Sequence, residues 1–470
     1  MRTKIIATIG PATSSRQMLT RLVEAGAYIF RLNFSHGSAE DFAGLIKLIR
    51  ELETDYGLPL TVLQDLPGPK IRIGQIDGDS IQVVKGQKLL LGMLESAQKP
   101  DSPFIPFDHP AILSSLETGD LLALADGALQ LEVARQVSKS LFEIKALNSG
   151  IITSRKGLAL PGKPVKLAAL TEVDRKNLKD GLLLGVDAVA LSYVQTPEDV
   201  REAKDFIREH GHDIPVIAKL ERRNAVDNLD EILKEADIVM VARGDLGVEC
   251  PLEELPGMQK RIIRACNKAS KPVIVATQML LSMVNSPTPT RAEVTDVANA
   301  VLDGTDCVML SEETAMGNYP VETVEYMHKI ATSAEELLWE TNYIAEPPMD
   351  SGAPDFLAYS ACLLAEKSNA SALVAHSSSG ATARLLSVRQ PRHPIYALTP
   401  SRQVLHNLNF SWGVKPWLIE EDESTHLDRV EKFIEAHSRF TRGEVFVITA
   451  GQPKVGHGSV KTNLVKIYLK

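Results

Sequence analysis

Eight short apolar runs recur along the first two thirds of the chain, and each is followed by a stretch with the periodicity of an amphipathic helix. The runs are continuously hydrophobic and rich in β-branched residues, which is typical of parallel strands buried on both faces. They span residues 4–9, 28–34, 60–66, 188–194, 215–221, 237–243, 272–278 and 306–311. Eight successive strand–helix units predict a (β/α)8 barrel, with a doubly wound open sheet as the alternative.

Three of the intervening helices have recognisable ends. Each is preceded by a residue whose hydroxyl can cap a helix N-terminus, and each is followed by a glycine. The signals are Ser38 with Asp41 and Gly57, Thr171 with Asp174 and Gly185, and Thr196 with Pro197 and Gly211.

One connection between the third and fourth runs is far longer than the others, at about 120 residues, which is too long for a loop in a compact domain. Turn signals such as Asp77-Gly78-Asp79, separated by short β-like runs, predict an inserted all-β domain over the C-terminal mouth of the barrel. A new strand–helix pattern starts near residue 345, with strands expected at 372–375, 395–398, 414–418, 445–450 and 464–469. The predicted organisation is a barrel of residues 1–69 and 167–344, an inserted β domain of 70–166 and a C-terminal α/β domain of 345–470.

Composition narrows the class of protein. The 51 basic and 60 acidic residues give 51 − 60 = −9, which argues against a nucleic-acid partner because binding phosphates requires a basic face. No apolar run reaches the ~20 residues that a membrane helix needs, so no membrane partner is expected. The four cysteines lie far apart, as expected of buried thiols in a cytoplasmic protein.

The C-terminal ends of barrel strands carry the chemistry in this architecture, so polar residues there are candidates for a site. Arg31, Asn33 and Ser35 alternate at the end of the second run and therefore share one face. A buried arginine is costly unless a partner neutralises it. A structural pair with a carboxylate is the alternative to a functional role.

Two carboxylates are expected at neighbouring strand ends. Lys219 and Glu221 share a face at the end of the fifth run, and Asp245 follows the sixth. Carboxylates without histidine or cysteine suit Mg2+, which keeps several water or substrate oxygens as ligands. An internal ion pair between Lys219 and Glu221 is the alternative.

The predicted barrel mouth is cationic on an otherwise acidic chain, because five basic residues lie at strand ends: Arg31, Lys70, Arg72, Lys219 and Arg243. A cationic mouth with a Mg2+ site favours a small phosphorylated anion as substrate. Neither the Walker P-loop pattern nor a glycine-rich dinucleotide fingerprint is present. The residues therefore predict Mg2+-assisted phosphoryl or enolate chemistry.

Several long motifs at these positions resemble pyruvate kinase, in order and over essentially the whole chain. They are Arg-Leu-Asn-Phe-Ser-His-Gly at 31–37, Gly-Pro-Lys-Ile-Arg at 68–72, Lys-Gly and Leu-Pro-Gly within 156–162, Met-Val-Ala-Arg-Gly-Asp-Leu-Gly-Val-Glu at 240–249, Ala-Thr-Gln-Met at 276–279, and Pro-Thr-Arg-Ala-Glu with Asp-Val-Ala-Asn within 289–299.

The resemblance implies that the chain transfers the phosphoryl group of phosphoenolpyruvate to ADP, giving pyruvate and ATP, with Mg2+ or Mn2+. It implies that Lys219 stabilises the transferring group and the enolate, that Glu221 and Asp245 hold the metal, and that Arg31, Gly244 and Thr277 contact the substrate. Arg72, Lys156 and His36 are implied to contact the nucleotide. A Mg2+-dependent carbon–carbon lyase acting on pyruvate enolate is the alternative function, although such a lyase needs neither Arg72, Lys156 nor the inserted domain.

The resemblance also implies a homotetramer with a sugar-phosphate effector in the C-terminal domain, at a loop with Ser377, Ser379 and Thr382. This loop contains no lysine, which favours a sugar monophosphate over a bisphosphate.

Related enzymes that need K+ hold it near positions matching Asn33, Ser35, Asp65 and Leu66. This chain has Leu66 and Lys70 where those enzymes carry threonine and glutamate, so K+ is expected to be unnecessary, with the Lys70 ammonium in its place. Further departures from the family pattern are Ala159, Gln195 and Glu312.

Overall fold

Eight parallel strands close into a barrel in the order β1-β16-β15-β14-β13-β12-β3-β2. The computed structural model describes residues 1–69, 71–96, 103–125, 127–163, 167–340, 344–451 and 462–470. Each barrel strand falls on one of the eight apolar runs, so the (β/α)8 prediction is confirmed and the open sheet is wrong. The strands are β1 (Lys4–Thr8), β2 (Ala27–Asn33), β3 (Thr61–Asp65), β12 (Ala188–Leu191), β13 (Val216–Leu220), β14 (Ile238–Ala242), β15 (Val273–Ala276) and β16 (Cys307–Leu310).

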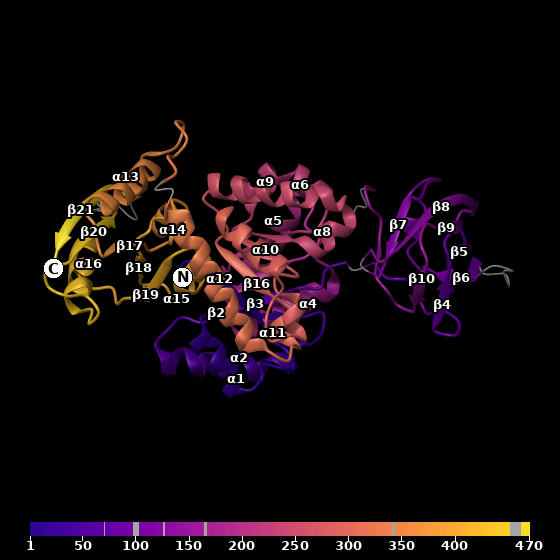
Figure 1. The fold of residues 1–470 in the computed structure, drawn as a ribbon, viewed down its shortest axis with the longest axis horizontal. Coiled ribbons are helices and arrows are strands. Elements are labelled where there is room, and N and C mark those ends of the chain that lie inside the picture. The colour runs from indigo at the N-terminus through magenta and orange to yellow at the C-terminus, as the bar shows by residue number, and fades with distance from the viewer. Residues whose placement is uncertain (70, 97–102, 126, 164–166, 341–343, 452–461) are drawn as a thin grey trace.

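Helices surround this barrel (Figure 1). They are α1 (Arg16–Ala25), α2 (Ala39–Tyr56), α4 (Glu172–Leu184), α5 (Pro197–Glu209), α6 (Arg223–Asp227), α7 (Leu229–Glu235), α8 (Arg243–Glu249), α9 (Leu255–Lys268), α10 (Arg291–Leu302), α11 (Glu312–Ala315) and α12 (Pro320–Glu340), with short 3-10 turns η2 (Leu252–Glu254) and η3 (Leu281–Val284). Within the described ranges, no helix combines the length and the apolar character that crossing a membrane requires.

The predicted ends of α2 and α4 agree with the structure, and the predicted start of α5 does too. Capping boxes begin α2 at Ser38 and α4 at Thr171, and Gly57 and Gly185 end these helices in the left-handed conformation. Thr196 caps α5, which ends at His210, one residue before the predicted Gly211.

The barrel interior changes from apolar to polar along β2, β3, β12 and β13. Inward-facing residues low in the barrel form one apolar cluster that includes Ile29, Leu63, Ala190 and Ile217. Two residues further along the same strands stand Arg31, Asp65, Ser192 and Lys219. Because side chains two apart in a strand share a face, these polar groups lie directly above the apolar layer.

The inserted segment between β3 and α4 forms a separate β structure at one end of the barrel (Figure 1). Its six-stranded sheet has the order β11-β7-β8-β9-β5-β6, and β10 pairs with β4. The described residues of the insert are therefore mainly β structure, as predicted, with one short α-helix that starts at a proline and one 3-10 turn. The elements are β4 (Ser80–Val83), β5 (Lys88–Gly92), η1 (Leu94–Ser96), β6 (Phe104–Pro106), α3 (Pro110–Leu113), β7 (Leu121–Leu124), β8 (Leu129–Ser138), β9 (Leu141–Ala146), β10 (Gly150–Thr153) and β11 (Leu158–Ala159).

The C-terminal part is a five-stranded sheet of order β19-β18-β17-β20-β21. All five expected strands are present, and β21 runs antiparallel to β20. The predicted boundaries at 69/70, 166/167 and 344/345 stay predictions, and residues 70 and 164–166 lie outside the described ranges. The elements are α13 (Ala353–Lys367), β17 (Ala372–His376), α14 (Ala381–Ser387), β18 (Ile395–Thr399), α15 (Arg402–Asn407), η4 (Leu408–Phe410), β19 (Val414–Leu418), α16 (His426–Ala436), β20 (Val445–Ala450) and β21 (Leu464–Leu469).

The C-terminal part is joined to the barrel by an apolar plug and a charged network. Phe410 belongs to the apolar cluster inside the barrel, so η4 closes the end opposite the charged layer. Beside it, His406 Nε2 lies 2.7 Å from Glu53 Oε1, and His406 Nδ1 lies 3.0 Å from Asp187 Oδ1. Burial lowers the pKa of His406, but hydrogen bonds to Asp187 and Glu53 outweigh it and raise the pKa to about 9.

This histidine gives the junction a predicted pH dependence. The folded-state pKa of His406 lies above its ordinary value of 6.5, so its stabilising effect is complete below that value and is lost as the pH rises through about 9. We expect His406→Gln to lower the thermal midpoint clearly at about pH 6 and much less at about pH 10. His393→Gln is the control, because burial lowers the pKa of His393 and its effect has the opposite sign. A cost of His406→Gln that did not change with pH would contradict this prediction.

Candidate active site

Four charged side chains form a continuous chain of ion pairs across the barrel mouth. Arg31 Nε lies 2.6 Å from Asp65 Oδ2, and Lys219 Nζ lies 3.1 Å from Asp65 Oδ1 and 2.9 Å from Glu221 Oε1. Asp65 and Glu221 are each 2 % exposed, whereas Arg31 is 12 % and Lys219 13 % exposed. At this depth isolated charges would be very costly, so the two cations and two carboxylates depend on one another.

The pKa values follow from these contacts. Burial alone would raise the pKa of Asp65, but Lys219 and Arg31 hold it below its ordinary value. Burial would lower the pKa of Lys219, but Asp65 and Glu221 raise it above its ordinary value. Lys219 is therefore a fixed positive charge. The ion pairs named as structural alternatives for Arg31 and Lys219 are both present, and the functional roles of these residues stay predictions.

The end of β12 holds both members of the Lys219–Glu221 pair. Lys219 Nζ donates to Ser192 Oγ at 2.6 Å, and Ser192 Oγ donates to the carbonyl of Leu66 at 2.7 Å. The backbone N–H of Tyr193 donates to Glu221 Oε2 at 2.8 Å. Tyr193 has a positive φ of 57°, which is rare for a bulky residue and is typical of functional sites.

Glu221 and Asp245 line the same small cavity beside Tyr193. Burial and the nearby Asp245 carboxylate raise the pKa of Glu221 against the pull of Lys219, so a cation between the two carboxylates would relieve their repulsion. In the part of the chain that the structure describes, no three histidine, cysteine or acidic side chains gather around one point. The pair thus fits an ion such as Mg2+, which takes its other ligands from water or substrate.

Gly244 and Thr277 meet where β14 and β15 end. The N–H of Gly244 donates to Thr277 Oγ1 at 2.8 Å, and Thr277 Oγ1 donates to the carbonyl of Ala276 at 2.6 Å. Thr277 and Gln278 both have positive φ, at 69° and 53°. A β-branched residue in this conformation is strained, and the hydrogen bonds of its hydroxyl help to hold it.

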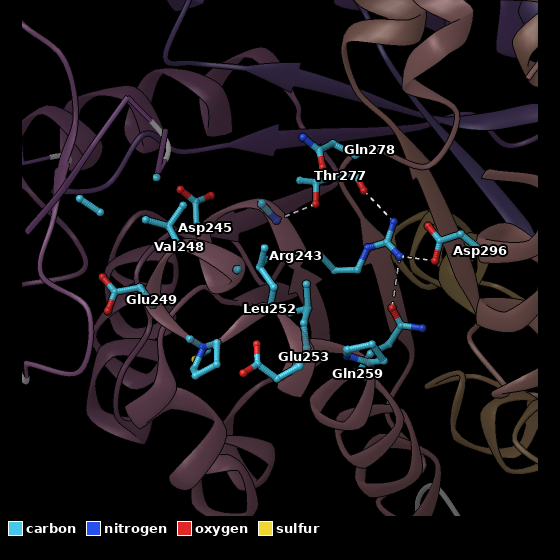
Figure 2. A pocket seen from close by; sticks show the side chains of 18 of the residues that line it. Arg243, Asp245, Val248, Glu249, Leu252, Glu253, Gln259, Thr277, Gln278 and Asp296 are labelled. Atoms are coloured by element: carbon cyan, nitrogen blue, oxygen red, sulfur yellow. Dashed lines mark hydrogen bonds and ion pairs between the residues drawn. The ribbon is translucent and has the colours of Figure 1, made fainter. Parts of the chain in front are cut away.

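A cleft of about 1460 Å³ separates this rim from the inserted β structure. Its walls include Asp245, Glu249 and Thr277 from the barrel, and Ala123 and Gly162 from the insert. Figure 2 shows Asp245, Val248 and Glu249 on one side of this space and Thr277 and Gln278 on another. The predicted position of the insert over the barrel mouth agrees with this shared cleft.

Arg243 lines the cleft, but its guanidinium is paired within the barrel, so its part in a cationic rim stays a prediction. Its guanidinium points away from Asp245 toward Asp296 (Figure 2), with Nη1 2.7 Å from Asp296 Oδ1. Its other donors bind the carbonyls of Ala276 and Thr277 at 3.1 and 2.7 Å. These carbonyls lie at the end of β15 and in the strained turn after it, and the arginine donates hydrogen bonds to both.

The three residues predicted to contact a nucleotide are not joined to the charged layer in this structure. Arg72 pairs with Gly157 in a short antiparallel bridge, and its Nη1 donates to the carbonyl of Arg155 at 3.0 Å. Lys156 and His36 are exposed. Arg72 and Lys156 flank Ile71 and Gly157, which line the small cavity with Glu221 and Asp245, so they stand next to the mouth.

The residues expected around a monovalent cation are already engaged with one another. Asn33 Oδ1 accepts the N–H of Ser35 at 3.1 Å, the Leu66 carbonyl accepts Ser192, and Asp65 lies between Arg31 and Lys219. Lys70, the proposed replacement for K+, lies outside the described residues.

The loop predicted to bind an effector joins β17 to α14. Ser377 N donates to the carbonyl of Leu398 at 2.9 Å, and the hydroxyls of Thr382 and Thr462 lie 2.6 Å apart. Thr382 is buried, whereas Ser379 is exposed, so only some of the hydroxyl-bearing side chains of this loop face solvent.

Among the departures from the family pattern, Gln195 is buried and hydrogen-bonded, and Glu312 lines the cleft. Gln195 Oε1 accepts from Asn224 Nδ2 at 2.8 Å. Glu312 lines the cleft with Thr277, and Ala159 lines the small cavity.

Sequence reasoning missed two contacts of the charged layer, made by the hydroxyl of Ser192 and the amide of Tyr193. The sequence signal for Ser192 was its position two residues after Ala190, because side chains two apart in a strand share a face. Sequence reasoning also missed Glu249, which lines the small cavity with Glu221 and Asp245. Burial raises the pKa of Glu249 to about 7.

Comparison with known proteins gives one family. The family model "Pyruvate kinase, barrel domain" matches residues 1–324, and "Pyruvate kinase, alpha/beta domain" matches residues 355–468. A pyruvate kinase of Bacillus licheniformis is 41% identical over 100% of this chain and 80% of its own length. One of Agrobacterium vitis is 42% identical over 99% of this chain and 98% of its own length, and pyruvate kinase 2 of Synechocystis is 41% identical over 99% and 79%.

Proposed function

The chain belongs to the pyruvate kinase family, and we propose that it transfers the phosphoryl group of phosphoenolpyruvate to ADP, giving pyruvate and ATP. The observation that carries this proposal is the buried chain of charges Arg31–Asp65–Lys219–Glu221 facing a cleft that Asp245 and Thr277 also line. Phosphoryl transfer requires positioning and charge neutralisation more than a covalent nucleophile, and this site offers both.

Glu221 and Asp245 would hold Mg2+, with Mn2+ able to take its place. When bound, the ion supplies positive charge to substrate oxygens. Arg31, fixed by Asp65 and by Thr8 Oγ1 at 3.0 Å, binds the phosphoryl group. Gly244 and Thr277 contact the rest of the substrate.

Lys219 neutralises charge on the transferring phosphoryl group and on the enolate that remains. Its raised pKa keeps it protonated throughout, so it acts as a charge donor rather than as a base. Arg72, Lys156 and His36 are proposed to bind the nucleotide. Because Arg72 and Lys156 belong to the insert, this role requires the insert to approach the barrel when ADP binds.

We further propose a cytoplasmic, homotetrameric enzyme of glycolysis, with no nucleic-acid or membrane partner. Light scattering of the purified protein would measure its oligomeric state. A stable monomer would contradict the proposed tetramer.

The reaction is tested by following pyruvate formation from phosphoenolpyruvate with and without ADP and Mg2+. We expect activity only when both are present, and Lys219→Met to lower turnover roughly 10²–10³-fold, the scale for losing one preorganised charge donor. Binding of phosphoenolpyruvate should change much less. A carbon–carbon lyase does not break the phosphate ester of phosphoenolpyruvate, so a lack of pyruvate even with ADP and Mg2+ present would favour the lyase alternative. Near-normal turnover of Lys219→Met would remove Lys219 from the chemistry.

Independence from K+ follows from Leu66 and Lys70. A tethered ammonium beside Asp65 would repel K+, since two like charges ~4 Å apart at an effective dielectric of ~20 repel by about 4 kcal/mol. We expect near-full activity with only Na+ or tetramethylammonium present, and a gain of K+ dependence in the double variant Leu66→Thr, Lys70→Glu. Activity of the unaltered enzyme that collapsed without K+ would exclude this proposal.

A sugar monophosphate is proposed as effector, bound at the loop with Ser377, Ser379 and Thr382. Hydroxyls without a lysine in the loop provide hydrogen bonds for one phosphate group but little charge for two. Titration of ribose 5-phosphate, glucose 6-phosphate and fructose 1,6-bisphosphate at low phosphoenolpyruvate should show stronger activation by a monophosphate. Strongest activation by fructose 1,6-bisphosphate would overturn the proposal of a monophosphate effector.

A further inference from the structure

Lys219 has two kinds of contact in the barrel mouth, and they differ in directionality. Its contacts with Asp65 and Glu221 are ion pairs at 3.1 and 2.9 Å, and Asp65 Oδ1 accepts no aligned hydrogen bond in the described structure. Its contact with Ser192 Oγ is a hydrogen bond of 2.6 Å. The carboxylates balance the charge of the ammonium, and Ser192 adds an aligned hydrogen bond from a neutral acceptor.

The Ser192 hydroxyl is itself fixed. It has a single proton, and it donates that proton to the carbonyl of Leu66 at 2.7 Å. Its lone pairs are therefore left for Lys219, which can only donate. A serine that was free to rotate would not set the position of the flexible lysine side chain in this way.

The backbone around Ser192 brings the two partners together. Ser192 follows β12 and is 2 % exposed, and the next residue, Tyr193, turns the chain with its positive φ. Gly68 packs so closely that a Cβ at that position would lie 2.8 Å from Cβ of Ser192 and 3.0 Å from Cδ2 of Tyr193. The loop after β3 can thus place the Leu66 carbonyl against Ser192 because residue 68 is glycine.

We propose that Ser192 is a positioning residue of the reaction, whose hydroxyl, oriented by the Leu66 carbonyl, holds the Lys219 ammonium where the transferring phosphoryl group and the enolate develop charge. This inference rests on the proposed function, because it acts through Lys219. During the reaction the ammonium must turn at least one N–H to the substrate. The bond to Ser192 keeps the nitrogen in place while it does so.

The test compares Ser192→Ala and Ser192→Cys with a matched control. Ser387 is also 2 % exposed, and its hydroxyl donates to the carbonyl of Trp412 at 2.7 Å. Ser387→Ala therefore removes the same kind of buried hydroxyl far from the barrel mouth. Cysteine keeps the approximate size of serine but is a weak acceptor, so it guards against a folding defect caused by lost volume.

We expect both Ser192 variants to lower kcat about 10- to 100-fold, the scale of one lost charge-assisted hydrogen bond. The KM for phosphoenolpyruvate should stay within about threefold, because the bond matters most in the transition state. The thermal midpoint of Ser192→Ala should fall about as much as that of Ser387→Ala, whose kcat should be unchanged. A kcat within about twofold of the unaltered enzyme for either Ser192 variant would overturn the proposal.

A double-mutant cycle with Lys219→Met decides whether Ser192 acts through the lysine. In the Lys219→Met background, Ser192→Ala should have almost no further effect on kcat. An equal loss in both backgrounds would overturn the inference. If Lys219→Met alone were nearly as active as the unaltered enzyme, the proposed function of Lys219 would fail instead, so the two failures are distinguishable.

Discussion

The charge balance inside the barrel mouth is the constraint on which the site depends. Two cations and two carboxylates are buried together, and Asp65 stands between Arg31 and Lys219. Removing any one of the four would leave an uncompensated charge at low dielectric, which costs far more than an exposed ion pair contributes. The same balance keeps Lys219 protonated and Asp65 ionised, so the geometry that stabilises the fold also prepares the electrostatics of the reaction.

The barrel makes this arrangement possible by dividing its interior into layers. The lower layer is apolar and is completed by Phe410 from the C-terminal part. The upper layer is charged and opens to the cleft. Phe410 packs there with large barrel side chains such as Ile29, Leu63 and Ile217 and with the small Ala188 and Ala190. Packing at one end of the barrel thus leaves the other end free for chemistry.

Sequence reasoning worked where a local rule fixes geometry. The apolar runs located all eight strands, and the two-residue period placed Arg31 with Asn33 and Lys219 with Glu221 on one face. It could not predict geometry that depends on distant residues. Arg243 follows a strand end as Lys219 does, but its direction is set by Asp296 and by the strained turn at Thr277, neither of which has a local signal. The His406–Glu53 contact joins residues 353 positions apart, beyond the reach of any periodicity.

Ion pairs and hydrogen bonds contribute differently to the position of a charged side chain, which explains why the barrel mouth contains more than its charged residues. Ion pairs vary slowly with distance and angle, so Asp65 and Glu221 can retain the Lys219 ammonium without fixing its orientation. Hydrogen bonds depend steeply on angle, and besides the Arg31–Asp65 bond the mouth has uncharged groups that form them: the hydroxyl of Ser192, the amide of Tyr193 and the hydroxyl of Thr277. Two of these three residues adopt strained backbone conformations. At Tyr193 the strained backbone places an amide against the Glu221 carboxylate, whereas the Thr277 hydroxyl bonds the backbone of Gly244 and Ala276. Burial and charge select which side chains occupy the mouth, and hydrogen bonds with Ser192 and Tyr193 fix the Lys219–Glu221 pair there.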